Sequence, residues 1–255
     1  MTTETRLCKL CCQARKLRCS HVIPETWYAA MYGPKLHRFR YMHDVDAGKA
    51  KWEQNGFKEY LLCEQCEQEL GVWDNYATRL FKTELPTSAQ GQAKPILFHG
   101  LDYAKLKLFF LSVLWRASVS TRPFFEHVKL GPHEDTIRDM LGRGIPGDPT
   151  DYGCVVSLLL RGGQPERSFV VEPTPCGMQD HEHDRYRFVF GGFFVLYFIS
   201  RQGLTPKLQQ TMLKADGSLI IQQMDPDDFD FLRDLRTRVL APASDGAVVN
   251  CTPTM

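Results

Sequence analysis

The sequence predicts an α+β protein in two parts, an N-terminal zinc module followed by a helix-plus-antiparallel-sheet domain. Three observations lead to this expectation. Two Cys-x-x-Cys pairs lie within the first 66 residues, and apolar residues recur at helical spacing in the middle of the chain. From residue 151 onward, β-branched and aromatic runs are broken by Gly, Pro and Asp, a pattern typical of strands. At 255 residues the chain is long enough for one large or two small domains with a sizeable core.

The cysteine pairs are the most specific signal. Two thiolates spaced two residues apart can bind one metal ion because the tight turn between them points both sulfurs inward. Two such pairs complete a tetrahedral four-cysteine zinc shell. Two further thiols, Cys12 and Cys19, lie beside the first pair, and either could replace its second member. The predicted Zn²⁺ ligands are Cys8, Cys11, Cys63 and Cys66.

The first unit spans residues 6–82 and contains both pairs. A helix is expected over Glu25–Tyr32, because Pro24 precedes it as a proline often precedes a helix. A second is expected over Glu67–Phe81, where apolar residues at helical spacing define a packing face. Gly33–Lys58, rich in charge and aromatic residues, is expected to be a strand or loop insertion.

Residues 83–95 are small and polar with two prolines, so they predict a linker to a second unit over residues 95–240. This unit is expected to begin with helices Leu101–Ser118 and His133–Leu141 and to end with a helix over Pro226–Leu240. The tail over 241–255 is small and polar and is expected to be frayed.

A mostly antiparallel sheet of five or six strands is expected between these helices. Asp216-Gly217 predicts a hairpin turn between the last two strands. The predicted strands are Cys154–Leu160, Ser168–Val171, Tyr186–Phe190, Phe193–Ile199, Gln209–Leu213 and Leu219–Gln223.

Composition limits the cellular setting. The N-terminus lacks the apolar segment of a signal peptide, and the longest apolar runs, Leu106–Trp115 and Phe188–Ile199, fall short of the roughly 20 residues that span a bilayer. We therefore expect a cytoplasmic protein without membrane contact, whose cysteines are reduced metal ligands rather than disulfides.

Local charge points to a polyanion, although the formal net charge of the whole chain is only +1. Between Thr5 and Arg40 there are eight basic residues and one acidic residue, with aromatic residues interleaved. Lys and Arg next to aromatic faces suit phosphate contact and base stacking, so DNA or RNA is the expected partner. Alternatively, part of the excess balances the charge of about −2 on a zinc ion held by four thiolates. The candidate contacts are Arg15, Lys16, Arg18, Lys35, Arg38 and Arg40.

Ser20-His21-Val22-Ile23-Pro24 and Leu61-Leu62-Cys63 carry a family resemblance. With the two cysteine pairs, they resemble HNH endonucleases that contain a structural four-cysteine zinc, over about residues 6–82. The resemblance implies a treble-clef (ββα) zinc module. It also implies that His21 is a general base that activates water beside a divalent Mg²⁺ or Mn²⁺. Alternatively, His21 is a hydrogen-bonded structural group beside the zinc.

The site departs from the family pattern at three positions. Ser20 replaces the metal-binding Asp, Lys58 replaces an Asn, and Glu67 replaces the final His or Asn. A neutral serine is a poor ligand for Mg²⁺, which prefers carboxylate and phosphate oxygens. Glu67 could be an oxygen ligand in a rebuilt site with Asp74 or Asn75, which makes it a candidate catalytic residue beside His21. Alternatively, it only stabilises the helix N-terminus.

Two functions follow. The first is a nucleic-acid-engaging protein with an HNH-like module, whose catalytic form is a metal-dependent endonuclease with an altered site. The second is a non-catalytic interaction protein in which zinc is structural and a protein is the partner. The chain also resembles uncharacterised bacterial HNH-like proteins with a region like Trp115–Ser118, which implies a bacterial defence or mobile-element setting. Asp180–Asp184 alternates acidic and histidine residues and is a metal chelator or, in the simpler interpretation, a solvated hairpin loop.

Overall fold

The computed structural model describes residues 5–29, 31–32, 38–43, 49–83, 85, 94–176, 184–201 and 204–234. Within these ranges the chain is a mixed α/β protein built around a mostly antiparallel sheet, as the sequence predicts. No helix in the described part of the chain has the length and apolarity that crossing a bilayer requires. Most of the expected linker, the Asp180–His183 segment and the 241–255 tail lie outside the described residues.

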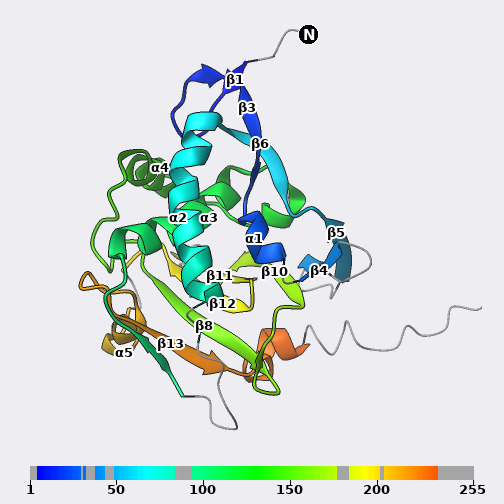
Figure 1. Cartoon of the computed structure of the whole chain (residues 1–255), viewed down its shortest axis with the longest axis vertical. Coiled ribbons are helices and arrows are strands. Elements are labelled where there is room, and N and C mark those ends of the chain that lie inside the picture. The colour runs from blue at the N-terminus through cyan, green and yellow to red at the C-terminus, as the bar shows by residue number, and fades with distance from the viewer. Residues whose placement is uncertain are drawn as a thin grey trace, which may run out of the picture.

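A nine-stranded sheet forms the lower half of the molecule (Figure 1). Two of its pairings are parallel, β4 with β10 and β8 with β13, and the others are antiparallel. In spatial order the strands are β5 (Lys49–Gln54), β4 (Arg38–His43), β10 (Phe169–Pro175), β11 (Arg185–Phe190), β12 (Phe193–Phe198), β8 (Cys154–Arg161), β13 (Leu219–Met224) and β7 (Ile96–Phe98), with β9 (Gln164–Pro165) beside β8.

The two expected units share this sheet and one hydrophobic core. Strands β4 and β5 belong to the range 6–82, yet β4 pairs with β10 through the register Arg40 to Phe169. Trp27 stacks on Phe109 with ring centroids 5.2 Å apart and also contacts Phe190 at 5.4 Å. The N-terminal residues are therefore packed into the same body as the sheet.

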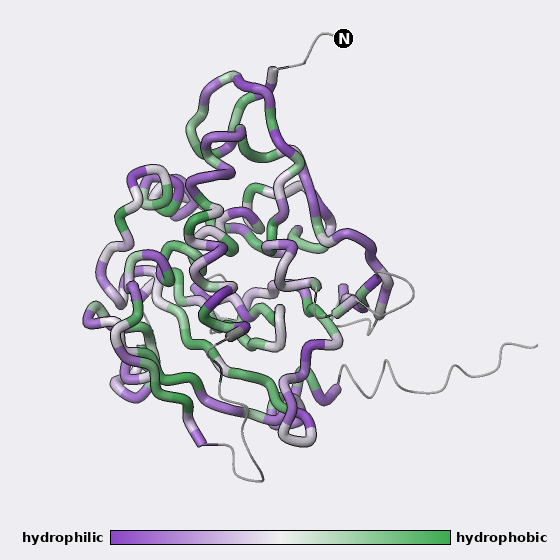
Figure 2. The backbone as a smooth tube through the Cα atoms, in the orientation of Figure 1, coloured by the Kyte–Doolittle hydropathy of each residue, from purple (hydrophilic) through white to green (hydrophobic). Residues whose placement is uncertain are grey.

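Helix α3 (Tyr103–Val119) lies at the centre of this body, and every residue from Leu106 to Ala117 is buried. It packs between α2 (Glu64–Thr83) and α4 (His133–Arg143). Because all sides of α3 face protein, its charged residues Lys107 and Arg116 must find partners inside the fold. Figure 2 shows hydrophobic residues along this central helix and along β8, whereas β5 is hydrophilic.

Two small hairpins stand above the sheet at the N-terminal end of α2 (Figure 1). Strand β1 (Arg6–Leu7) pairs with β2 (Ala14–Arg15), and β3 (Leu17–His21) pairs with β6 (Lys58–Cys63). The β3–β6 register places Leu17 opposite Cys63 and His21 opposite Lys58. Helix α2 begins where β6 ends and runs from the hairpins toward the sheet. The expected helix at residue 25 is the short α1 (Glu25–Tyr28).

One predicted strand is wrong. Gln209–Leu213 was expected to be extended, but Pro206–Thr211 forms helix α5. Thr205 caps this helix by accepting a hydrogen bond from the backbone N–H of Leu208, and Pro206 occupies its first turn, both standard start signals. The hairpin expected at Asp216-Gly217 is therefore also wrong, and β13 pairs instead with β7, a strand that the sequence did not predict.

The glycine turn between β11 and β12 is required by packing. Gly191 and Gly192 have φ values of 62° and 87°, in the left-handed region that favours glycine. A Cβ at Gly191 would also lie 2.2 Å from Cε3 of Trp27. The turn therefore allows the N-terminal tryptophan to pack directly against the sheet.

A short 3₁₀ helix, η2, spans Pro123–Phe125 between α3 and α4.

The C-terminal segment packs on the sheet. It begins with a second 3₁₀ helix, η4 (Pro226–Asp228), which is held by a reciprocal capping box of Asp225 and Asp228, and residues 230–234 continue as helix. Leu232 packs in a second apolar cluster that includes Phe194. The end of the expected closing helix, residues 235–240, lies outside the described residues.

Candidate metal centre

Four cysteine sulfurs converge between the two small hairpins and the start of α2. The Sγ atoms of Cys8, Cys11, Cys63 and Cys66 all lie within 4.8 Å of one another, and those of Cys11 and Cys63 are 3.9 Å apart. Tetrahedral zinc with Zn–S bonds of about 2.3 Å places its sulfurs about 3.8 Å apart, whereas a disulfide needs about 2.05 Å. The donor set therefore fits a four-coordinate metal ion such as zinc.

The backbone around the first pair forms a tight loop between β1 and β2. The N–H of Cys8 donates to the carbonyl of Gln13, and the N–H of Cys12 donates to the carbonyl of Cys8, each at 2.9 Å. Cys12 adopts a φ of 56°, which reverses the chain directly after the second ligand. Such a loop, or knuckle, points both of its cysteine sulfurs to one side.

The second pair lies where a strand meets a helix. Cys63 is the last residue of β6, and Cys66 lies in the first turn of α2. The N–H of Lys9 donates to the carbonyl of Leu61 at 2.9 Å, so the knuckle is bonded directly to β6. The N–H of Cys63 donates to Sγ of Cys8 at 3.3 Å, so one ligand residue stabilises charge on another.

Burial separates the four ligand cysteines from the neighbouring thiols. Cys8, Cys63 and Cys66 are buried and Cys11 is partly buried, whereas Cys12 and Cys19 are exposed and lie outside the cluster. Burial raises the pKa of a thiol, but in Cys8 the backbone N–H groups of Cys11 and Cys63 outweigh it and lower the pKa. N–H groups directed at this sulfur favour the thiolate, which is the metal-binding form.

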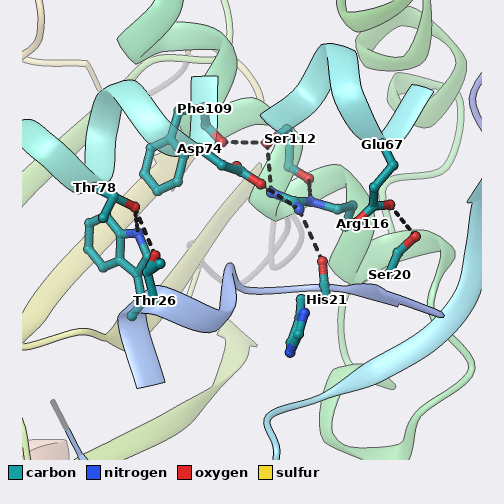
Figure 3. A network of polar contacts seen from close by, with 10 residues as sticks. Ser20, His21, Thr26, Glu67, Asp74, Thr78, Phe109, Ser112 and Arg116 are labelled. Carbon is teal, nitrogen blue, oxygen red and sulfur yellow. Dashed lines mark hydrogen bonds and ion pairs between the residues drawn. The ribbon is translucent and has the colours of Figure 1, made fainter. Parts of the chain in front are cut away.

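Ser20 and Glu67 form a pair at the other end of β3. Ser20 is fully buried, and its hydroxyl donates a short hydrogen bond to a carboxylate oxygen of Glu67 in the first turn of α2 (Figure 3). The structure thus brings these two predicted site residues together. A serine hydroxyl occupies the position where the HNH resemblance places a carboxylate, and it is satisfied by the helix glutamate.

The imidazole of His21 lies on the opposite side of β3 from Arg116 (Figure 3). Successive side chains on a strand point to opposite faces, so Ser20 faces α2 and His21 faces away from it. Nε2 of His21 lies 3.2 Å from the carbonyl oxygen of Asn55, which makes Nε2 the protonated nitrogen and leaves the lone pair on Nδ1. Burial, followed by the positive charge of Lys58, lowers the pKa of His21. His21 is therefore a neutral, partly buried imidazole at pH 7.

Arg116 fills the space behind His21. It is 2% exposed, and its two terminal nitrogens bond the two carboxylate oxygens of Asp74 at 2.9 and 3.1 Å. Nη1 also donates to the carbonyl of His21 at 3.0 Å, and Nε donates to the carbonyl of Ser112 at 3.2 Å. The guanidinium joins α3, α2 and β3, and it engages Asp74, one of the two residues considered for a rebuilt metal site.

The predicted catalytic residues do not converge. Glu67 bonds Ser20 on one side of β3 and the ring of His21 lies on the other (Figure 3). Among the described residues, the four cysteines are the single group of three or more Cys, His, Asp or Glu side chains placed to share one ion. The predicted chelator residues His181 and His183 lie outside the described ranges.

The predicted basic residues fall in two places. Arg15, Lys16 and Arg18 are exposed on the hairpins around the cysteines, where Arg15 donates to Gln65 at 3.0 Å and Arg18 forms an ion pair with Glu64. Arg38 and Arg40 lie on β4, and both contact the ring of Trp52. Lys35 lies outside the described residues. Sequence reasoning missed Trp52, although the alternation Arg38-Phe-Arg40 could have indicated an outward arginine face.

Comparisons with protein-family models, curated proteins and solved structures found no match. The functional argument therefore starts from the geometry of the cysteine cluster, the two faces of β3 and the exposed basic residues.

Proposed function

We propose that residues 6–82 contain a treble-clef zinc module of the HNH type, and that this module binds nucleic acid without cutting it. The order of elements supports the first part. A knuckle is followed by a β-hairpin and a helix, and the thiol pairs come from the knuckle and from the helix start. This is the arrangement that the HNH resemblance implies, here with α1, β4 and β5 inserted between the hairpin strands.

The hydrogen bond from Ser20 to Glu67 is the observation that carries the proposal of binding without cleavage. HNH-type hydrolysis requires a divalent cation next to the base, and Mg²⁺ prefers free carboxylates and phosphate oxygens. Here Glu67 already accepts from a buried hydroxyl, and Asp74 is engaged by Arg116. Binding a cation would require breaking these contacts, and the His21 ring lies on the opposite face.

Charge supports the nucleic-acid part. Over the described residues 5–29 there are five basic side chains and one acidic side chain. Arg15 bonds the neutral side chain of Gln65, and Arg18 forms an exposed ion pair with Glu64, which is worth only about 0–1 kcal/mol. The geometry therefore leaves these side chains available to a polyanion.

A gel shift at several salt concentrations tests the binding. Wild-type protein should bind duplex DNA with an affinity that falls steeply with salt, by a slope of about 0.9 per phosphate contacted. The triple variant Arg15→Gln, Lys16→Gln, Arg18→Gln should bind more weakly with a shallower slope. The matched control is Arg138→Gln with Arg143→Gln on α4, which should bind like wild type. Salt-independent binding, or no binding to either duplex or single-stranded DNA, would contradict the proposal and favour a protein partner, with zinc purely structural.

The endonuclease remains the second candidate because of the His21 geometry. A neutral imidazole whose Nε2–H is fixed by a carbonyl presents Nδ1 as a proton acceptor, which is the state a general base requires. In that case Glu67 would release Ser20 and bind Mg²⁺ or Mn²⁺. Plasmid nicking with either ion, compared between wild type and His21→Ala, separates the two candidates. Nicking that depends on His21 would establish the enzyme, and equal background in both proteins supports binding alone.

A further inference from the structure

An exposed tryptophan lies beside two arginines at the edge of the large sheet. Trp52 is 54% exposed, although a tryptophan is usually largely buried. Cζ of Arg38 lies 4.5 Å from its ring centroid, and Cζ of Arg40 lies 5.4 Å from it. These three side chains are called the Trp52 platform below.

The β4–β5 register explains why the platform faces outward. Arg40 is directly opposite Trp52 and Arg38 is two residues further along β4, so all three share one face. Phe39, on the other face of β4, is 1% exposed and packs against Phe57 in the aromatic core. The core thus takes Phe39, whereas on the other face Trp52 is exposed and Arg38 and Arg40 are partly exposed.

The platform also carries net positive charge. Within the described ranges no carboxylate forms an ion pair with Arg38 or Arg40. Glu53, the acidic residue in the described part of β5, is opposite Phe39 on the other face, and its carboxylate lies 3.4 Å from Arg122. An exposed indole beside two guanidinium groups, neither ion-paired with a carboxylate of the described residues, presents an aromatic group together with cationic donors.

We propose that the Trp52 platform binds an unpaired base and its phosphate, so that the preferred ligand is single-stranded nucleic acid. Aromatic rings and arginine planes stack on exposed bases, and guanidinium groups contact phosphates. A duplex hides its base faces in the helical stack, so it offers this platform only its backbone. The inference rests on the proposed nucleic-acid function and adds the strand state and a second contact point.

The position of the platform fits a ligand that extends over several nucleotides. Strand β5 leads through Asn55–Phe57 into β6, and β6 ends at the cysteine cluster. The platform and the basic hairpins therefore lie at opposite ends of β6 (Figure 1). One flexible strand can follow β6 and contact both.

Fluorescence anisotropy with a labelled 15-nucleotide oligothymidine and a labelled duplex tests the proposal. Trp52→Ala should weaken oligothymidine binding about tenfold and leave duplex binding unchanged, because one stacked base is lost. Trp52→Phe keeps an aromatic face and should stay within about threefold of wild type. Arg38→Gln with Arg40→Gln should weaken binding of the oligothymidine and reduce its salt dependence. Thermal unfolding of each variant checks that the fold is retained.

Three results would overturn the proposal. If Trp52→Ala lowers the melting temperature but binds oligothymidine like wild type, the platform only stabilises the hairpin edge. If a labelled oligoglutamate peptide binds in a Trp52-dependent way and oligothymidine does not, the ligand is an acidic peptide. If the duplex binds through Arg15 and Arg18 while Trp52 variants behave like wild type with both ligands, only this inference fails. Absence of any nucleic-acid binding removes the proposed function as well.

Discussion

The two ends of the β3–β6 hairpin satisfy their chemically active groups in different ways. At the Leu17–Cys63 end, four sulfurs face one another in a cluster whose geometry fits a metal ion. At the His21–Lys58 end, the hydroxyl of Ser20 bonds Glu67 and the carbonyl of His21 bonds Arg116. The comparison teaches that one hairpin can gather groups that fit a metal ion at one end and pair its polar groups with protein partners at the other.

Removing the metal should have the largest effect. Structural zinc in small modules contributes an apparent 10–16 kcal/mol of binding free energy, about as much as a whole domain's stability. Cys66→Ser, or wild type treated with a strong chelator, should therefore lose the fold of the N-terminal hairpins. Circular dichroism and thermal unfolding measure this loss. Cys12→Ser is the matched control, because Cys12 is exposed and outside the cluster. If both variants unfold at the same temperature, the cysteine cluster stabilises the hairpins no more than an exposed thiol does.

Asp74→Ala should be the next largest change. It leaves the guanidinium of Arg116 buried without its carboxylate, which typically costs about 3–5 kcal/mol. Urea unfolding measures the free energy. The control is Asp139→Ala, whose partner Arg143 is exposed, and it should cost about 0–1 kcal/mol. If the two variants unfold at the same urea concentration, the buried pair does not stabilise β3.

Ser20→Asp restores the acidic residue of the HNH pattern at the end of β3 where Ser20 bonds Glu67. It should have an intermediate effect on stability. A second carboxylate beside Glu67 should lower the melting temperature without a divalent ion, because like charges repel at a buried position. Millimolar Mg²⁺ or Mn²⁺ should restore part of the loss by binding the folded state. Ser20→Ala, which adds no charge, should show no ion response. An ion-dependent rise in the wild-type melting temperature would contradict the interpretation that Ser20 and Glu67 leave no cation site at this end of β3.

The smallest effect should come from the protonation of His21. Burial, then Lys58 and Arg116, lower its pKa, whereas Glu25 raises it, and the net folded pKa lies below the ordinary value of about 6.5. The unfolded state then binds the proton more readily, so stability present above pH 6.5 is lost as pH falls through the folded pKa. Urea unfolding at pH 7.5 and 5.5 should show a smaller pH difference for His21→Gln than for wild type. NMR titration of the imidazole gives the pKa directly, and a value above 6.5 would refute this account.

Local patterns allowed part of this structure to be predicted. The pairing of sulfurs within each Cys-x-x-Cys follows from spacing, and α3 follows from apolar periodicity, because each depends on neighbouring residues. The meeting of the two pairs, 52 residues apart, was expected because a tetrahedral zinc ion needs four ligands. Strand β7 was missed because three residues are too few to show an alternation of apolar and polar side chains. Helix α5 was missed because the start signals at Thr205 and Pro206 were not considered.

The contacts that decide the candidate site are long-range. Ser20 and Glu67 are 47 residues apart and Arg116 and His21 are 95 residues apart, so no local pattern indicates either bond. The parallel pairing of β4 with β10 joins equally distant segments and could not be predicted from the pattern of either strand. The treble-clef, HNH and nucleic-acid assignments stay predictions.

The metal content and its ligands test the central claim most directly. Metal analysis of the purified protein, with X-ray absorption at the zinc edge, should give one zinc per chain and four sulfur neighbours at about 2.3 Å. Cys63→Ser should lose that shell. Protein that folds normally without zinc, or zinc bound through nitrogen and oxygen ligands, would contradict the account.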